Sequence, residues 1–326
     1  MPKLTLSLLT SAAAMVAVIS PGAAALGATV RFEAESTGAV KDKNDAVGYD
    51  SLSGVMGRGG DASASNGEVL YTLGMDRKIK IVFAGTGIDL IAPTTNDGAQ
   101  FKWTLNEGVQ TGLGTTIGAG GPQSVIPIIS GLPNGLHTLE IEKANNVDFV
   151  LRMDAFDVHD SGERVRYEET DPAIVYSPGA WALGDTGGNA AQEASGGSIG
   201  YTIVQGATAT LQFTGTGVAA NIVSRLDGLA FSYDIDGVVT GTIDTSAEAS
   251  RVSAGFWHRY PFLLANDLTN GPHTLTLTAI GGAVGGVDFI GILDSIDVFQ
   301  PAVPEPATAA LVTIALSAIT VANRRS

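Results

Sequence analysis

Phe83-Ala84-Gly85-Thr86-Gly87-Ile88 recurs as a near copy, Phe213-Thr214-Gly215-Thr216-Gly217-Val218, at an offset of 130 positions. The same offset relates Val69-Leu70-Tyr71-Thr72 to Ile199-Gly200-Tyr201-Thr202. Stretches that recur in the same order and at the same spacing indicate duplication of a whole unit. The chain is therefore predicted to contain two copies of one domain.

Each copy begins with a segment in which polar and apolar residues alternate, and the two copies end with segments that match each other. The opening segments are residues 29–35 and 164–170, and the closing segments are residues 154–158 and 294–298. Such alternation is typical of half-buried strands, and the sequence shows no convincing amphipathic helix. Short strands at this spacing predict a sandwich or jelly roll in which the closing strand lies near the first.

The predicted fold class is all-β, with two tandem β-sandwich domains. Their bounds are residues 26–160 and 161–300, and residues 159–163 link the copies closely. Long glycine-rich stretches without periodicity are expected to be loops, and Asp97-Gly98 is expected to form a hairpin turn.

The amino-acid composition limits the kinds of partner and of site that the chain can have. The 326 residues include 33 acidic and 18 basic side chains, a formal net charge of −15, which argues against nucleic acid as a partner. The chain has no cysteine, so disulfides, thiolate nucleophiles and sulfur-based zinc sites are excluded. The 42 glycines suit short strands joined by many turns.

The N-terminal segment has the zones of a secretory signal peptide. Lys3 precedes an apolar run over residues 4–19, which ends at Ser20-Pro21-Gly22 and small residues. We expect export, with cleavage after Ala25, so that residues 1–25, including a signal helix, lie outside the folded body.

The C-terminal segment, residues 301–326, has the features of a protein-sorting signal. Pro304-Glu305-Pro306 is followed by the uncharged residues 307–322 and then by Arg324 and Arg325. Residues 307–322 are predicted to form a hydrophobic helix slightly shorter than a usual membrane span. This order resembles the PEP-CTERM sorting signal of bacterial envelope proteins. The resemblance implies transient membrane anchoring through the helix, recognition by an exosortase, and release to the cell surface or extracellular matrix. A plain C-terminal anchor is the alternative.

The body resembles a second family. Four segments carry the resemblance: Phe32-Glu33-Ala34-Glu35, the Phe-x-Gly-Thr-Gly stretch, and residues 134–139 and 154–158. Together they are similar to the galactose-binding-like jelly rolls of carbohydrate-binding modules of the family-6 and family-35 type. The resemblance implies non-catalytic binding of extracellular polysaccharide.

The same resemblance implies a structural calcium ion in copy one. The ligands implied by position are Glu33, Glu35 and either Asp154 or Asp157, and carboxylates suit calcium. In copy two Thr170 replaces the second glutamate, which leaves a site there in doubt. The alternative for these acids is a solvated face, or pairing with Arg31 and its counterpart in copy two.

Two motifs of enzymes are present but lack their structural setting. The glycines of residues 215–220 would need a following helix to bind a dinucleotide, and Ser198 would need one to form a nucleophile elbow, whereas strands are predicted after both. Paired carboxylates such as Asp234 and Asp236 leave a polysaccharide hydrolase as a weaker alternative, although a hairpin explains them as well.

Ligand-binding candidates are aromatic and polar residues outside the shared core, because aromatic faces on loops can stack on sugar rings. A structural or adhesive scaffold without a specific ligand is the alternative, and Trp257 also has the pattern of a core residue. The candidates are Trp181, Tyr176, Trp257, Arg259, Tyr260 and Tyr49.

Overall fold

A computed structural model describes the body of the chain. Residues 27–303 form one compact unit. We call residues 29–159 half 1 and residues 164–300 half 2. The predicted signal segment and sorting tail lie outside the described residues. The described residues are 29–33, 47–49, 56–62, 64–65, 67–72, 78–144, 149–187, 194–224, 230–244, 258–280 and 291–300.

The described residues are almost entirely strands and turns, and the only helical element among them is the short 3₁₀ turn η1 (Asn106–Gly108). The predicted all-β class is confirmed. No helix among these residues has the length and apolar character of a membrane span. The strands of half 1 are β1 (Val30–Glu33), β2 (Val47–Tyr49), β3 (Met56–Gly60), β4 (Glu68–Thr72), β5 (Lys78–Thr94), β6 (Gln100–Leu105), β7 (Gln110–Thr115), β8 (Gly121–Lys143), β9 (Leu151–Met153) and β10 (Ala155–His159).

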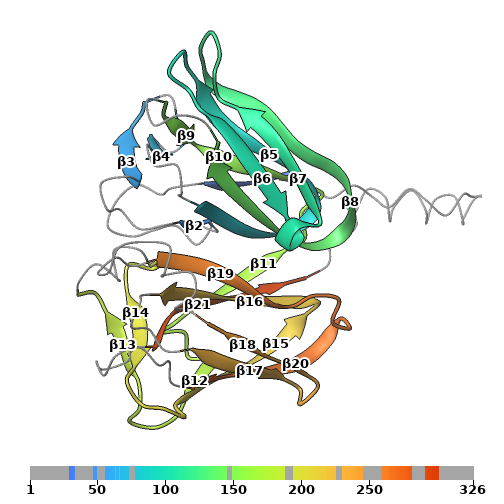
Figure 1. The fold of residues 1–326 in the computed structure, drawn as a ribbon. Coiled ribbons are helices and arrows are strands. Elements are labelled where there is room, and N and C mark those ends of the chain that lie inside the picture. Colours follow the sequence, from blue (N-terminus) through green and yellow to red (C-terminus); the bar gives the residue numbers. More distant parts are fainter. Residues whose placement is uncertain are drawn as a thin grey trace, which may run out of the picture. The chain divides into compact units, whose positions relative to one another are not determined.

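Half 2 repeats this plan with shorter strands. Figure 1 shows its two layers, one of β12, β15, β20, β17 and β18 and the other containing β14, β21, β16 and β19. The strands are β11 (Arg164–Glu168), β12 (Ile174–Tyr176), β13 (Ala182–Asp185), β14 (Ile199–Thr202), β15 (Thr208–Gly215), β16 (Gly217–Ser224), β17 (Phe231–Ile235), β18 (Val239–Ile243), β19 (His258–Ala265), β20 (Gly271–Ala279) and β21 (Gly291–Phe299).

The first strand of each half pairs with its last. In half 1, β1 is antiparallel to β10, and in half 2, β11 is antiparallel to β21. This confirms the predicted closeness of the first and last strands. The register pairs Arg31 with Asp157 and Arg166 with Asp297. It also pairs Glu33 with Ala155 and Glu168 with Ser295, the residues that follow Asp154 and Asp294.

The Gly-Thr-Gly stretch marks the corner at which the chain passes from one layer to the other. In half 2 it separates β15 from β16, whereas in half 1 β5 runs through it with a register shift between Gly85 and Gly87. A Cβ at Gly85 would lie 2.4 Å from the His159 carbonyl oxygen, and one at Gly215 would lie 2.6 Å from that of Phe299. Close approach of the last strand therefore explains these glycines. Neither Gly85 nor Gly215 has a positive φ.

Each half has its own hydrophobic core. One cluster runs from Phe32 to Val158, and the other from Ile174 to Val298. A third cluster contains Val82, Ala84 and Leu136 from half 1 together with buried side chains from half 2. The outer surface of half 1 at β5 and β8 is therefore partly covered.

Two local predictions were wrong. Asp97-Gly98 does not form a hairpin, because β8 lies between the strands β5 and β6 that it connects. The long glycine-rich stretches are not loops throughout, since they contain the short strands β2 and β3 in half 1 and β12 and β13 in half 2.

Three strand glycines lie directly under aromatic rings of the neighbouring strand. Phe101 covers Gly114, Trp103 covers Gly112, and Tyr233 covers Gly241. The rings fill the space of the missing side chains. Trp103 and Tyr233 both pack against the hydrophobic cores of their halves. Gly241 is half-buried beneath Tyr233.

We therefore predict that Gly114→Ala lowers the free energy of unfolding by about 1–3 kcal/mol, because its Cβ would lie 2.2 Å from Cζ of the buried Phe101. Gly135→Ala is the matched control, since no atom lies within 4 Å of a Cβ there, and it should change stability by less than about 0.5 kcal/mol. Urea unfolding of both variants measures the difference. Equal stability of the two variants would contradict this packing.

Candidate functional site

The pairing of first and last strands brings two carboxylates together in half 1. Glu33 lies at the end of β1, and Asp154 lies between β9 and β10. The Ser65 hydroxyl is within hydrogen-bond distance of both, 2.8 Å from Asp154 Oδ1 and close to Glu33 Oε2. The Ser65 backbone N–H donates to Asp154 Oδ1 at 2.9 Å, and Gln123 Nε2 donates to Asp154 Oδ2 at 2.9 Å.

Half 2 has the same arrangement. Ser195 lies between Glu168 and Asp294, with its hydroxyl 2.9 Å from Glu168 Oε2 and 3.1 Å from Asp294 Oδ1. The Ser195 backbone N–H donates to Asp294 Oδ1 at 2.9 Å. Where half 1 has a glutamine, half 2 has Arg259, whose Nη1 is 3.8 Å from Asp294 Oδ2.

The strand register shows that Gln123 and Arg259 are counterparts. Ser124 pairs with Ala92 on β5, and Tyr260 pairs with Ile222 on β16, 130 positions after Ala92. The residues that precede Ser124 and Tyr260 therefore occupy equivalent positions. We call Glu33, Ser65, Gln123 and Asp154 the half-1 tetrad, and Glu168, Ser195, Arg259 and Asp294 the half-2 tetrad.

The two carboxylates of each tetrad share a region that is partly removed from water. Burial raises the pKa of Glu33, and Asp154 adds to the increase. In half 2, burial together with Asp294 raises the pKa of Glu168 to about 7. Burial also raises the pKa of Asp294, although Arg259 and Arg166 oppose it.

Asp157 belongs to a different interaction. Arg31 donates from Nε and Nη2 to the two Asp157 oxygens at 2.7 and 2.8 Å. Arg166 makes the same paired contact with Asp297 in half 2, and there Arg166 and Arg164 hold the pKa of Asp297 well below its usual range despite burial. Asp157 is therefore corrected from a calcium candidate to a strand partner of Arg31, and Asp154 is the acid next to Glu33.

Two of the predicted sugar-binding aromatics pack against the core. Trp181 and Tyr176 are 5.0 Å apart between ring centroids, and Trp181 stacks on Phe231 at 6.4 Å. The Tyr176 hydroxyl donates to the Glu169 carbonyl oxygen at 2.8 Å. Both rings are half-buried, and the Trp181 Nε1 atom is buried with no hydrogen-bond partner.

Arg259 and Tyr260 do not form a ligand surface. Each is 1% exposed, because β19 is an inner strand of its sheet. The prediction that they bind ligand is wrong. The backbone of Tyr49 pairs with Arg259, and its side chain lies outside the described residues, as do all of Trp257 and Glu35.

The histidines of the repeated strands have structural partners. His273 lies 5.4 Å from the Phe213 ring, its Nε2 is 2.8 Å from the Thr269 carbonyl oxygen, and its Nδ1 is 2.5 Å from Asp236. Asp236 raises the pKa of His273. His137 makes the corresponding contacts in half 1.

A hydroxyl-rich surface covers the outer face of the five-stranded sheet of half 2. Along β15, β17 and β20, buried side chains alternate with half-exposed or exposed polar ones. We call these polar residues, with two on β18, the hydroxyl face. The repeated Thr-x-Thr pattern could have revealed it, but exposed strands commonly have threonine. Its members are Thr208, Thr210, Gln212, Thr214, Ser232, Asp234, Thr240, Thr242, Thr274, Thr276 and Thr278.

The hydroxyl face adjoins a hollow of about 540 Å³. Its wall includes Gln212, Thr214 and Thr274 from the face, together with the half-buried ring of Tyr167 and Gln300. Hydroxyl and amide groups in such a hollow can both donate and accept hydrogen bonds.

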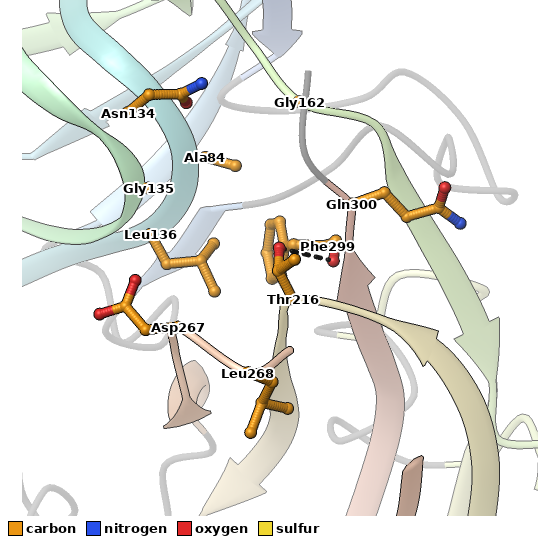
Figure 2. A pocket seen from close by; sticks show the side chains of 10 residues that line it. All are labelled: Ala84, Asn134, Gly135, Leu136, Gly162, Thr216, Asp267, Leu268, Phe299 and Gln300. Carbon is orange, nitrogen blue, oxygen red and sulfur yellow. Dashed lines mark hydrogen bonds between the residues drawn. The ribbon is translucent and has the colours of Figure 1, made fainter. Parts of the chain in front are cut away.

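A second pocket, of about 330 Å³, has a different character (Figure 2). Backbone and apolar groups form much of its wall, including Leu136, Leu268 and Phe299, and its polar side chains include Asn134 and Asp267. None of the residues predicted from sequence to bind ligand or metal lines it.

Comparisons with known proteins find distant similarities. No protein-family model and no curated protein sequence matches the chain. The C-terminal family-6 carbohydrate-binding module of a laminarinase from Zobellia galactanivorans is 14% identical, with a TM-score of 0.29, and the match covers 42% of this chain and all of the module. The tandem family-22 modules of a Paenibacillus barcinonensis protein are 12% identical, with a TM-score of 0.26, over 86% of this chain and all of theirs.

A two-domain esterase active on acetylated mannans is also similar, at 12% identity and a TM-score of 0.35. The match covers 43% of this chain and 37% of the esterase, so the chain spans little more than a third of that enzyme. Neither a ligand nor an activity of this chain follows from similarities at this distance.

Glu168 should make the stability of the chain depend on pH. Its pKa is about 7 in the folded protein against an ordinary value of 4.5, so the folded state binds a proton more tightly than the unfolded state between these values. The contribution of Glu168 to the free energy of unfolding therefore falls as pH rises from 4.5 to 7. Glu168→Gln removes this loss, so the stability of the variant relative to the wild type should be greater at pH 8 than at pH 5. Urea unfolding at both pH values tests it, and an unchanged difference would contradict the assignment.

Proposed function

We propose that this chain is an exported, non-catalytic polysaccharide-binding protein of the cell surface or extracellular matrix. The observation that carries the binding proposal is the hydroxyl face of half 2 with its adjoining hollow. Export rests on the signal-like N-terminus and on the Pro304-Glu305-Pro306 tail, with an exosortase as the partner that would recognise it.

The hydroxyl face suits a polymer of sugars. Thr210 and Asp234 flank Thr276 on adjacent strands, and Ser232 flanks Thr278. Adjacent strands lie about 4.8 Å apart, and residues on one face recur about every 7 Å along a strand. Polar groups at this density can form several hydrogen bonds along one sugar chain. The half-buried Tyr167 ring borders the adjoining hollow.

The equivalent face of half 1 is built differently. Lys80 and Glu140 lie 4.0 Å apart as a charge pair, Val82 and Ala84 are buried, and Lys102 is exposed. We therefore assign sugar binding to half 2 and a supporting role to half 1.

A structural calcium ion belongs to the proposal for half 1. Glu33, Asp154 and Ser65 bring carboxylate and hydroxyl oxygens together, which is the donor chemistry that calcium prefers. Burial, with a smaller contribution from Asp154, raises the pKa of Glu33, and a nearby positive charge would favour its ionised form. The described residues contain no group of three or more acidic or histidine side chains placed to hold a metal. Glu35, the further predicted ligand, lies outside them.

A ligand-free scaffold is the second candidate function. The observation in its favour is that Trp181 and Tyr176 pack against the core of half 2. In this case the sandwiches would serve as spacers in the matrix.

Replacing three threonines of the hydroxyl face tests sugar binding. The triple variant Thr274→Val, Thr276→Val and Thr278→Val keeps strand-forming side chains but removes three hydroxyls. Each lost hydrogen bond costs about 0.5–1.5 kcal/mol, so we expect a roughly tenfold or greater rise in Kd. The measurement is a glycan array on residues 27–303, followed by calorimetry with the bound polysaccharide.

The matched control places the same three changes on half 1, at Thr104, Thr111 and Thr115. This variant should bind as the wild type does. Binding unchanged in both variants would remove the hydroxyl face as the site. Absence of binding to every polysaccharide tested would favour the scaffold.

Calcium should raise the Tm of the wild-type chain, because a ligand that binds only the folded state stabilises it. Glu33→Gln should remove most of this increase by deleting a carboxylate ligand. Glu163→Gln, an exposed acid in the link between the halves, is the control and should keep it. Calorimetric melting with calcium and with a chelator measures the effect, and an equal response of both variants would refute the site.

A further inference from the structure

The two tetrads differ in one chemical group. Both contain a glutamate, a serine and an aspartate in the same contacts, but half 1 has the neutral Gln123 where half 2 has the cationic Arg259. The amide of Gln123 donates one hydrogen bond to its aspartate. The guanidinium of Arg259 brings a full positive charge close to Asp294.

The remaining arginines do not account for this difference. Arg31 is engaged by Asp157 in half 1, and Arg166 is engaged by Asp297 in half 2 through the same paired hydrogen bonds. These pairs match each other. Arg164 is a further arginine of half 2, but it lies beside Asp297, with its Nη1 3.7 Å from Asp297 Oδ2. Arg259 is therefore the additional positive charge beside Asp294.

Access to solvent also differs between the tetrads. In half 1, Gln123 and Ser65 are exposed. In half 2, Ser195 and Asp294 are 0% exposed and Arg259 is 1% exposed. Asp154 and Asp294 are both 0% exposed, and Glu33 and Glu168 are both half-buried, so the difference lies in the serine and in the fourth residue of each tetrad. In half 1 these two residues are exposed to water, whereas in half 2 they are buried and the fourth residue is a cation.

We propose that Arg259 takes the place of a metal ion in half 2, so that the dependence of this protein on divalent cations is confined to half 1. The guanidinium offsets the negative charge of the fully buried Asp294 in a region of low dielectric, where such an interaction is strong. The same charge repels a divalent cation. This inference rests on the calcium proposal for half 1 and is independent of sugar binding.

Reciprocal exchange of the two residues tests the inference in the full chain. Gln123→Arg gives half 1 the cation of half 2, and Arg259→Gln gives half 2 the neutral group of half 1. Arg152→Gln is the control, because the Arg152 guanidinium pairs with Asp97 rather than with a carboxylate of either tetrad. Each protein is stripped with a chelator and titrated with calcium by calorimetry, and its Tm is measured with and without calcium.

The wild type and the Arg152→Gln control should each bind a single calcium ion and show a higher Tm with calcium. Gln123→Arg should bind none, and its Tm without calcium should match or exceed that of the calcium-free wild type. Arg259→Gln should have a lower Tm without calcium, and calcium should restore more of it than in the wild type as a second ion binds.

Calcium binding by Gln123→Arg at wild-type affinity would overturn the inference, and so would two ions bound by the wild type. Because Gln123 is exposed, the Gln123→Arg variant folds without any change in the core. Its calcium titration therefore still tests the inference if Arg259→Gln does not fold. Absence of any calcium response in the wild type would instead refute the half-1 site, whatever the outcome for sugar binding.

Discussion

Pairing of the first strand with the last places two carboxylates side by side in both halves, and their repulsion must be relieved before either sandwich can close. A serine between the acids supplies hydrogen bonds in each half. One hydroxyl proton cannot compensate two negative charges. The remaining compensation differs between the halves, and so does the solvent exposure of each site.

The polar interior of half 2 extends beyond its tetrad. Asn221 donates to Asp297 at 2.9 Å and to Ser295 at 3.1 Å, and Arg166 completes a buried network. Half 1 has Ile91 and Ala155 at the equivalent positions, judged from the strand register. The two halves therefore share a strand plan, but half 2 has buried neutral polar side chains where half 1 has apolar ones. Such networks tolerate the loss of a single member poorly, because the partner is left buried without compensation.

The sequence was sufficient for the features that depend on local spacing. The offset of the Gly-Thr-Gly stretches revealed the duplication. Alternation in the opening segments and the match between the closing segments predicted strands at both ends of each half. It was insufficient where strands distant in sequence meet. Arg259 resembled a surface residue because nothing local places β19 inside a sheet, and Asp97-Gly98 resembled a hairpin because the insertion of β8 cannot be seen from the turn.

Pairing of the first strand with the last constrains when each half can fold. Arg31 and Asp157 are separated by 126 positions, and Arg166 and Asp297 by 131, so the contact that closes each half joins its two ends. Contacts of such long sequence separation slow folding, because loop closure must precede the gain in stability. Neither half can complete its sandwich until its last strand has been synthesised, and each half therefore folds as a unit only once its full length is free.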